Sequence, residues 1–134
     1  MVQRPYYSKK VIERFMHPRN LGVIKDADGV GKVGNMKCGD LMELFIKVEK
    51  KKNKEVIKDI KFRTLGCAAA ISTSDMICDL AKGKTFKEAL KVGFQDIADK
   101  LGNMPPQKIH CCVLAQQGLK AAIEDYEKKK KSKK

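Results

Sequence analysis

Two stretches of alternating apolar and polar residues constrain the fold of this chain most strongly. Every second side chain is apolar in residues 42–48, and residues 60–64 repeat the pattern around Lys61 and Arg63. A period of two places the apolar side chains on one face of a strand. The lysine-rich residues 50–54 lie between the stretches and provide a turn. The sequence therefore predicts an antiparallel hairpin, and residues 31–36 are a candidate third strand.

Helical periodicity marks the segments on both sides of these strands. In residues 7–16, one helical face carries Val11, Ile12, Phe15 and Met16, which predicts a helix that packs on the core. Four further helices are expected, between Gly66 and Gly83, from Thr85 to Gly93, from Asp96 to Leu101, and from Pro105 to the lysine-rich end. These elements predict an α+β fold, a three-stranded antiparallel sheet with about five helices packed on it.

The charge of the chain is uneven. Lysine and arginine number 29 against 16 acidic residues, and residues 128–134 hold six lysines. We expect a single domain over residues 1–127 and a disordered lysine-rich tail over residues 128–134. No aromatic residues that could stack on bases are interleaved with the lysine runs, so nucleic-acid binding is not expected.

Membrane insertion and secretion are not expected either. No apolar run approaches the roughly 20 residues that a membrane helix needs, and the start does not match a signal peptide. A formal G-x-G-x-x-G occurs at residues 29–34, but a dinucleotide-binding motif must open a helix. Here a strand follows, so we reject that interpretation. We expect a soluble, cytoplasmic protein.

The five cysteines are an odd set in a chain without a secretion signal, which argues against a disulfide framework. They are Cys38, Cys67, Cys78, Cys111 and Cys112. None forms a C-x-x-C pair, so the usual zinc-ribbon and thioredoxin signatures are missing. Cys78 follows Cys67 by eleven residues, roughly 16 Å along a helix, so one metal ion cannot bind both. We predict that Cys78 and Cys112 are core residues.

The other three cysteines stand where a metal site can form. Cys38 is two residues from Asp40 at the start of a strand, so both side chains point the same way. Cys67 lies at a strand-to-helix junction, and Cys111 follows His110 in the first turns of the last helix; helix starts favour a thiolate. This set suits tetrahedral zinc or a small iron-sulfur cluster, and the spacing does not choose between them. A ligand other than thiolate favours delivery of a cluster over storage.

Several motifs together resemble the IscU scaffold proteins of iron-sulfur cluster assembly, a family that includes the N-terminal domain of NifU. The matching segments are 7–12, 17–22, Cys38-Gly39-Asp40, 64–67 and 105–111. The resemblance implies an IscU/SufE-like α+β fold. It also implies that the chain is a scaffold and not an enzyme.

The resemblance assigns roles to the candidate ligands. Cys38, Cys67 and Cys111 would hold a nascent [2Fe-2S] cluster, with Asp40 and His110 as exchangeable ligands. Cys111 would be the main acceptor of persulfide sulfur, for which we expect an accessible thiolate. Ferrous iron would be a substrate, and Zn²⁺ is a candidate ligand of the cluster-free form.

The resemblance also implies partners: a cysteine desulfurase (IscS/NifS-like) as sulfur donor, an electron donor such as ferredoxin, an iron donor and apo-protein acceptors. The segment recognised by Hsp70 and J-protein chaperones in this family corresponds to Met104, Pro105, Pro106, Gln107 and Lys108. Gln107 replaces an apolar residue of that motif.

The alternative is a zinc-holding sulfur carrier similar to SufU. Those relatives carry an insertion between the second and third cysteines and lack the histidine. The short segment between Cys67 and Cys111 and the presence of His110 favour the scaffold.

Overall fold

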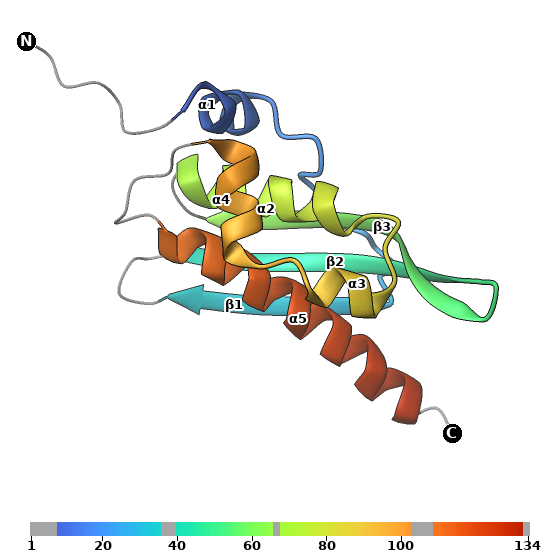
Figure 1. Ribbon diagram of the computed structural model, residues 1–134. Coiled ribbons are helices and arrows are strands. Elements are labelled where there is room, and N and C mark those ends of the chain that lie inside the picture. The colour runs from blue at the N-terminus through green and yellow to red at the C-terminus, as the bar shows by residue number, and fades with distance from the viewer. Residues whose placement is uncertain (1–7, 36–39, 66–67, 103–108, 133–134) are drawn as a thin grey trace, which may run out of the picture.

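The computed structural model describes residues 8–35, 40–65, 68–102 and 109–132, and it confirms the predicted α+β architecture (Figure 1). Its three strands form one antiparallel sheet in the order β1-β2-β3. The elements are α1 (Lys9–Met16), β1 (Gly29–Asn35), β2 (Asp40–Lys51), β3 (Lys54–Leu65), α2 (Ala68–Ala81), α3 (Phe86–Leu90), α4 (Phe94–Leu101) and α5 (Ile109–Ser132).

The predicted hairpin is formed by β2 and β3. Leu44 pairs with Phe62 and Ile46 with Ile60, and all four side chains are fully buried. The two residues of its turn, Lys52 and Asn53, have φ angles of 51° and 67°. This left-handed conformation suits the tight turn between two twisted strands.

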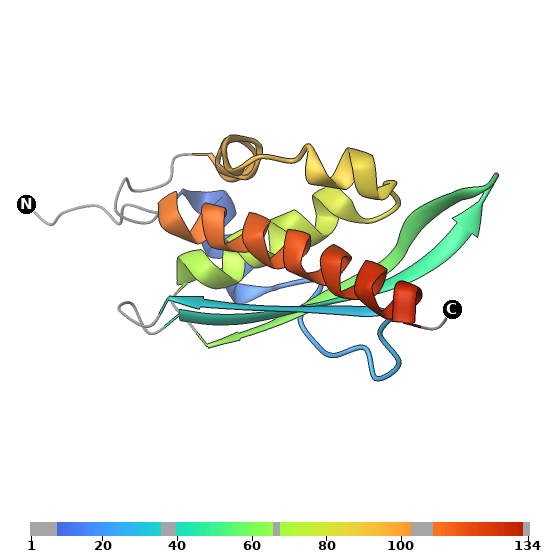
Figure 2. The same ribbon diagram turned by 90° about the horizontal axis from the view of Figure 1, so that it is seen from below.

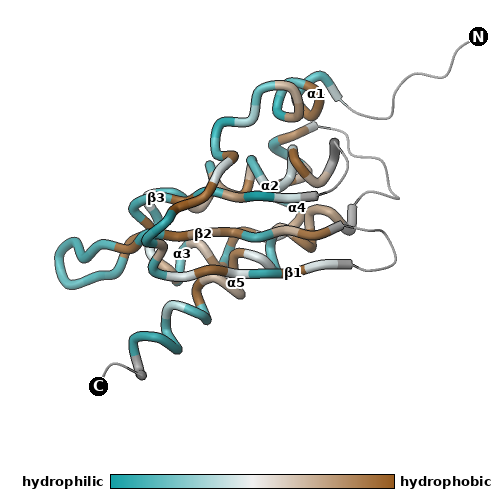
Figure 3. The backbone as a smooth tube through the Cα atoms, turned by 180° about the vertical axis from the view of Figure 1, so that it is seen from behind, coloured by the Kyte–Doolittle hydropathy of each residue, from teal (hydrophilic) through white to brown (hydrophobic). Residues whose placement is uncertain are grey.

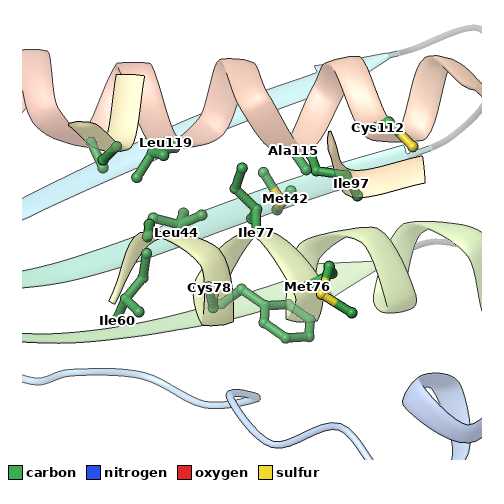
Figure 4. Packing of buried hydrophobic residues seen from close by; sticks show 14 of the residues in the cluster. Met42, Leu44, Ile60, Met76, Ile77, Cys78, Ile97, Cys112, Ala115 and Leu119 are labelled. Carbon is green, nitrogen blue, oxygen red and sulfur yellow. The ribbon is translucent and has the colours of Figure 1, made fainter. Parts of the chain in front are cut away.

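The helices cover one face of the sheet, as the sequence predicts. Helices α2 and α5 lie over this face (Figures 1 and 2). Apolar side chains from both helices and from the sheet meet in a single core, in which Met42 and Leu44 lie beside Ile77 and Leu119 (Figure 4).

Helix α5 approaches β1 with almost no space between the two backbones. A Cβ atom added to Gly31 would lie 2.3 Å from the carbonyl oxygen of Gly118, and one added to Gly29 would lie 2.3 Å from that of Ala122. Real contacts at these distances are forbidden by sterics. The first two glycines of the formal G-x-G-x-x-G therefore serve helix-on-strand packing, which agrees with rejecting the nucleotide motif.

The free edge of β3 is covered by the segment after α1. The amide of Gly22 donates to the carbonyl of Phe62 (2.8 Å), and the amide of Phe62 donates to the carbonyl of Asn20 (2.9 Å). The chain then crosses the sheet face opposite α2 and α5 before entering β1 (Figure 2). The crossing segment shields an edge that would otherwise offer unpaired backbone groups.

The prediction that α1 packs on the core through its apolar face is wrong for three of the four residues. Val11 is buried, but Ile12, Phe15 and Met16 are 41%, 40% and 61% exposed. The reason lies in contacts between α1 and residues that are distant in the sequence. Polar contacts described below fix the helix with a different face toward α2, so helical periodicity alone pointed to the wrong side.

The end of α5 also differs from the expectation. The helix continues to Ser132, so residues 128–132 are helical where a disordered tail was predicted. Lysine is a good helix former and is favourable near a helix C-terminus. Glu55 of β3 also accepts hydrogen bonds from Tyr126 and, at 3.0 Å, from Lys130. Burial, followed by the bond to Glu55, raises the pKa of Tyr126 to about 12.

Candidate functional site

The described ends of four elements meet at one end of the molecule. Asn35 at the end of β1 pairs with Asp40 at the start of β2, and Leu41 pairs with Leu65 at the end of β3. The first turn of α5, which begins at Ile109, lies at the same end (Figures 1 and 2). Two of the predicted ligands, Cys38 and Cys67, lie outside the described residues, between these strand ends and the elements that follow them.

Helix α2 connects this end to α5. It begins at Ala68, directly after Cys67 in the sequence. The Thr73 hydroxyl lies 3.3 Å from the carbonyl oxygen of Cys111 and donates to it. This contact fixes the first turn of α5 against the N-terminal half of α2. Asp40 on β2 and His110 on α5 are placed by their backbones at the same end of the fold.

Cys111 is the one predicted ligand that the structure describes in full. It lies in the first turn of α5, as the sequence predicts, but only 1% of it is exposed. The expectation of an accessible thiolate is therefore wrong for this conformation. Its backbone carbonyl accepts the hydrogen bond from Thr73 of α2, so this turn of α5 is packed against α2.

Cys78 and Cys112 are core residues, as predicted. Both carry free thiols that are fully buried among apolar side chains (Figure 4). Burial raises the pKa of Cys112 to about 11, and burial followed by the nearby charge of Asp75 raises the pKa of Cys78 well above its ordinary value. Neutral, buried thiols of this kind are poor nucleophiles and poor metal ligands.

Four consecutive polar residues of α2 are buried, and sequence reasoning did not single them out. Their side chains contact α1, β2 and α5, and the Thr73 hydroxyl also contacts the carbonyl of Ala70 in its own helix. The Ser72 hydroxyl donates to the carbonyl of Val11 in α1 (2.6 Å), and the Ser74 hydroxyl contacts the sulfur of Met42 in β2 (2.8 Å). This run makes α2 the element that positions its neighbours.

Asp75, the fourth residue of the run, holds the segment that follows α1. Its carboxylate accepts hydrogen bonds from Arg14 Nη1 (2.7 Å) and from the amides of Arg19 (2.9 Å) and Asn20 (2.8 Å), and it has no exposed surface. A buried carboxylate needs this many partners to offset its desolvation. His17 is the exposed C-cap of α1.

A second carboxylate completes this cluster. Asp79 accepts a hydrogen bond from the side-chain amide of Asn20 (3.0 Å) and forms an ion pair with Arg14. Partial burial acts to raise the pKa of Asp79, but the bonds from Asn20 and Arg14 outweigh it and hold that pKa below its ordinary value. The carboxylate is therefore ionised and paired at neutral pH.

The sheet end that carries Asp40 also bears a hollow of about 370 Å³, whose lining includes Leu41, Thr64 and the charged pair of Glu43 and Arg63. The hydrogen bond from Arg63 holds the pKa of Glu43 below its usual value.

Within the described side chains, no three His, Cys, Asp or Glu residues cluster as metal ligands. None of the helices in the described ranges is long and apolar enough to cross a membrane. The predicted chaperone segment, residues 104–108, is outside these ranges.

Known proteins are similar to this chain over most of its length. The family model described as "NifU-like N terminal domain" matches residues 6–133. The chain is 54% identical over 123 residues to iron-sulfur cluster assembly scaffold protein IscU 1 of Archaeoglobus fulgidus, covering 92% of this chain and 78% of that protein. It is 43% identical over 130 residues to IscU of Escherichia coli, covering 95% and 98%.

A solved structure shares the fold. The SUF-system scaffold protein FiSufU of Fervidobacterium islandicum superposes with a TM-score of 0.68, covering 88% of this chain and 96% of that one. At 21% identity this likeness shows the fold alone. It agrees with the α+β architecture predicted from the sequence.

Proposed function

The chain belongs to the family of NifU-like N-terminal domains, and from this premise we propose that it is a scaffold on which a [2Fe-2S] cluster is assembled and passed to apo-proteins. The observation that carries the proposal is the similarity over nearly the whole chain to relatives that are named as cluster assembly scaffolds, at 43% to 54% identity. The meeting of β1, β2, β3 and α5 at one end of the fold supports it, because the predicted ligands are distributed over these junctions.

The cluster is the cargo of this site. Cys38, Cys67 and Cys111 supply thiolates, and Asp40 or His110 supplies the remaining, exchangeable ligand. Thiolate is the ligand that iron-sulfur clusters prefer, whereas an oxygen or imidazole ligand holds the iron less firmly. This donor set suits a cluster that must be built and then released. The cluster-free form can hold Zn²⁺ with the same donors.

Sulfur reaches the site by transfer of a persulfide. The Cys111 thiolate attacks the outer sulfur of the persulfide on a cysteine desulfurase, which forms a new S–S bond on Cys111 and releases the donor's thiolate. Each sulfur then needs two electrons to become sulfide, and an electron donor such as ferredoxin supplies them. Because Cys111 is buried, the first turn of α5 must open before the donor can reach it.

The scaffold contributes ligands and docking surfaces, not turnover. The chemistry belongs to the desulfurase, the iron source and the electron donor, so the chain is not an enzyme on its own. Residues 104–108 are the proposed contact for Hsp70 and J-protein chaperones, with Gln107 weakening that contact. We place the protein in the cytoplasm.

Anaerobic reconstitution with ferrous iron, cysteine and a desulfurase tests the proposal. We expect visible charge-transfer bands in the wild-type protein and in Cys78→Ala, which removes a thiol buried in the core. The bands should be lost in Cys38→Ala, Cys67→Ala and Cys111→Ala. One tightly held zinc ion with a persulfide on Cys111, and no bands, would instead identify a sulfur carrier.

Asp40→Ala should give a longer-lived cluster. Asp40 lies at the first residue of β2, beside the site, and its carboxylate provides an easily exchanged oxygen ligand. The measurement is the decay of the visible bands after reconstitution. Glu43→Ala is the matched control, since Glu43 is an acidic residue of the same strand that pairs with Arg63. Equal decay rates in the wild type and Asp40→Ala would contradict the role of Asp40.

A further inference from the structure

Helix α1 turns its apolar stripe away from the protein. Ile12, Phe15 and Met16 occupy positions i, i+3 and i+4, so they lie on one face of the helix. All three are at least 40% exposed, whereas Val11 is fully buried. Figure 3 shows α1 at the periphery of the fold, with hydrophobic residues in its backbone trace. An exposed stripe at this spacing is the arrangement by which a helix fits into a groove of another protein.

The opposite face of α1 is fixed by polar contacts. The side chain of Ser8, the N-cap, donates to the carbonyl of Leu101 at the end of α4. Arg14 pairs with the buried Asp75, and the carbonyl of Val11 accepts from Ser72. The helix cannot roll to bury its apolar stripe without breaking these contacts, and this would leave Asp75 without its cation. The outward direction of the stripe is thus built into the fold.

The surroundings of the stripe are basic. Lys9 and Lys10 are exposed at the start of α1, and the side chain of Arg19 is 63% exposed just beyond its end. Glu13 is the acidic residue of the helix, and it lies 3.9 Å from Arg19 in a solvated pair. A partner surface that matches this face is apolar at its centre and carries carboxylates at its border.

We propose that the outward face of α1 docks into an apolar, carboxylate-bordered groove on the protein that donates sulfur to this chain. This inference rests on the proposed function. Adjacent residues of α2 contact both places, because the Ser72 hydroxyl donates to the carbonyl of Val11 in α1 and the Thr73 hydroxyl donates to that of Cys111 in α5. A protein seated on α1 therefore lies at the end of the molecule where the sulfur acceptor is.

A second copy of this chain does not fit the same face. Two α1 helices packed together would bring the lysines of both copies close to each other, and the net charge of +13 repels copies at longer range. Three side chains of an eight-residue helix also bury far less area than a stable dimer needs. In a larger heterologous contact the same three side chains serve as anchors.

The test compares two double variants of the full chain. Phe15→Ser with Met16→Ser removes most of the stripe, and Leu90→Ser with Phe94→Ser removes two apolar residues on α3 and α4 that are also more than 40% exposed. Binding to a pyridoxal-phosphate-loaded cysteine desulfurase is measured by calorimetry. We expect the α1 variant to bind about tenfold or more weakly and the control to bind within about twofold of wild type. Equal affinity of wild type and the α1 variant would overturn the proposal.

Reconstitution with inorganic sulfide separates this proposal from the proposed function, because it needs no desulfurase. The α1 variant should form the cluster normally from sulfide and slowly from the desulfurase. Failure of the wild type to form a cluster from sulfide would overturn the proposed function, whatever the affinities are. Concentration-dependent dimers in sedimentation that disappear in the α1 variant would identify a second copy as the occupant and overturn the docking proposal.

Discussion

Helices α5 and α1 are attached to the same protein by opposite kinds of contact. Helix α5 lies on β1 through glycine positions that leave no room for a Cβ atom, and it buries Leu119, Ala122 and Ile123. Helix α1 buries Val11 alone among its own residues and is attached to α2 by Arg14 and by hydrogen bonds from α2.

This difference in attachment indicates which part of the protein is rigid and which part can adjust. Close apolar packing is insensitive to salt and pH but tolerates no added volume. A polar attachment tolerates changes of shape, yet it depends on the ion pairs that Arg14 forms with Asp75 and Asp79. The middle of α5, around Gly118 and Ala122, is therefore held rigidly on β1, whereas α1, the helix proposed to meet the sulfur donor, is held by an adjustable attachment.

The largest expected effect is on the α5 attachment. Gly31→Ala places a Cβ 2.3 Å from the carbonyl oxygen of Gly118 and 2.5 Å from the amide nitrogen of Ala122. Both are backbone atoms, so the helix must move away, and we expect a loss of about 3 kcal/mol in the free energy of unfolding by urea. Gly93→Ala is the control, because its Cβ would meet only Asp96 at 3.8 Å. Similar losses in both variants would refute close packing as the reason.

An intermediate effect is expected on the α1 attachment. Asp75→Asn keeps the side-chain shape but removes the charge that faces Arg14. Hydrogen bonds to charged groups contribute about 1.5–3 kcal/mol, so α1 should open more easily by about 2 kcal/mol. Hydrogen exchange should therefore speed up in residues 9–20 and stay unchanged in α5. An equal increase in α5 would show that α1 does not open as a separate unit.

The smallest effect is a pH dependence. The pKa of Asp79 is lowered in the folded protein, so its contribution to stability is complete above the ordinary pKa of an aspartate. It is lost as the pH falls through the lower folded value. Hydrogen exchange at decreasing pH, corrected for intrinsic rates, should show α1 opening before α5. Helix α5 has two comparable carboxylate contacts, Asp125 with the amide of Val30 and Glu55 with Tyr126 and Lys130, but its packing on β1 does not titrate. Opening of both helices at the same pH would contradict the difference between the polar attachment of α1 and the apolar attachment of α5.

The sheet and most helix ends could be predicted because they depend on local signals. Alternation around Leu44 and Phe62 identified β2 and β3, and a helix was expected from Thr85, where the structure has the capping box of Thr85 and Glu88 at the start of α3. In each case the residues that decide the structure are close in the sequence, or repeat with the period of the element.

The polar attachments could not be predicted because their partners are distant in the sequence. Asp75 and Arg14 are 61 residues apart, and a run of polar residues within a helix ordinarily indicates a solvated face. Because these distant contacts could not be predicted, the apolar face of α1 was expected to pack on the core. Gly31 did carry a signal, since a glycine within a strand indicates close approach of another backbone, but the sequence does not say that α5 is the approaching element.

For the candidate site, the predicted place of Cys111 at the start of α5 is confirmed, and its predicted exposure is wrong. Exposure depends on how α2 and α5 pack together, which the position of a residue at a helix start does not reveal. The ligand roles of Cys38, Asp40, Cys67 and His110 remain predictions.

Native mass spectrometry of the anaerobically reconstituted chain tests the scaffold proposal most directly. We predict a mass increase of two iron and two sulfide per cluster, lost together when Cys38, Cys67 or Cys111 is replaced by alanine and retained in Cys78→Ala. A single zinc ion that persists after reconstitution, with one extra sulfur on Cys111, would contradict the scaffold and identify a sulfur carrier.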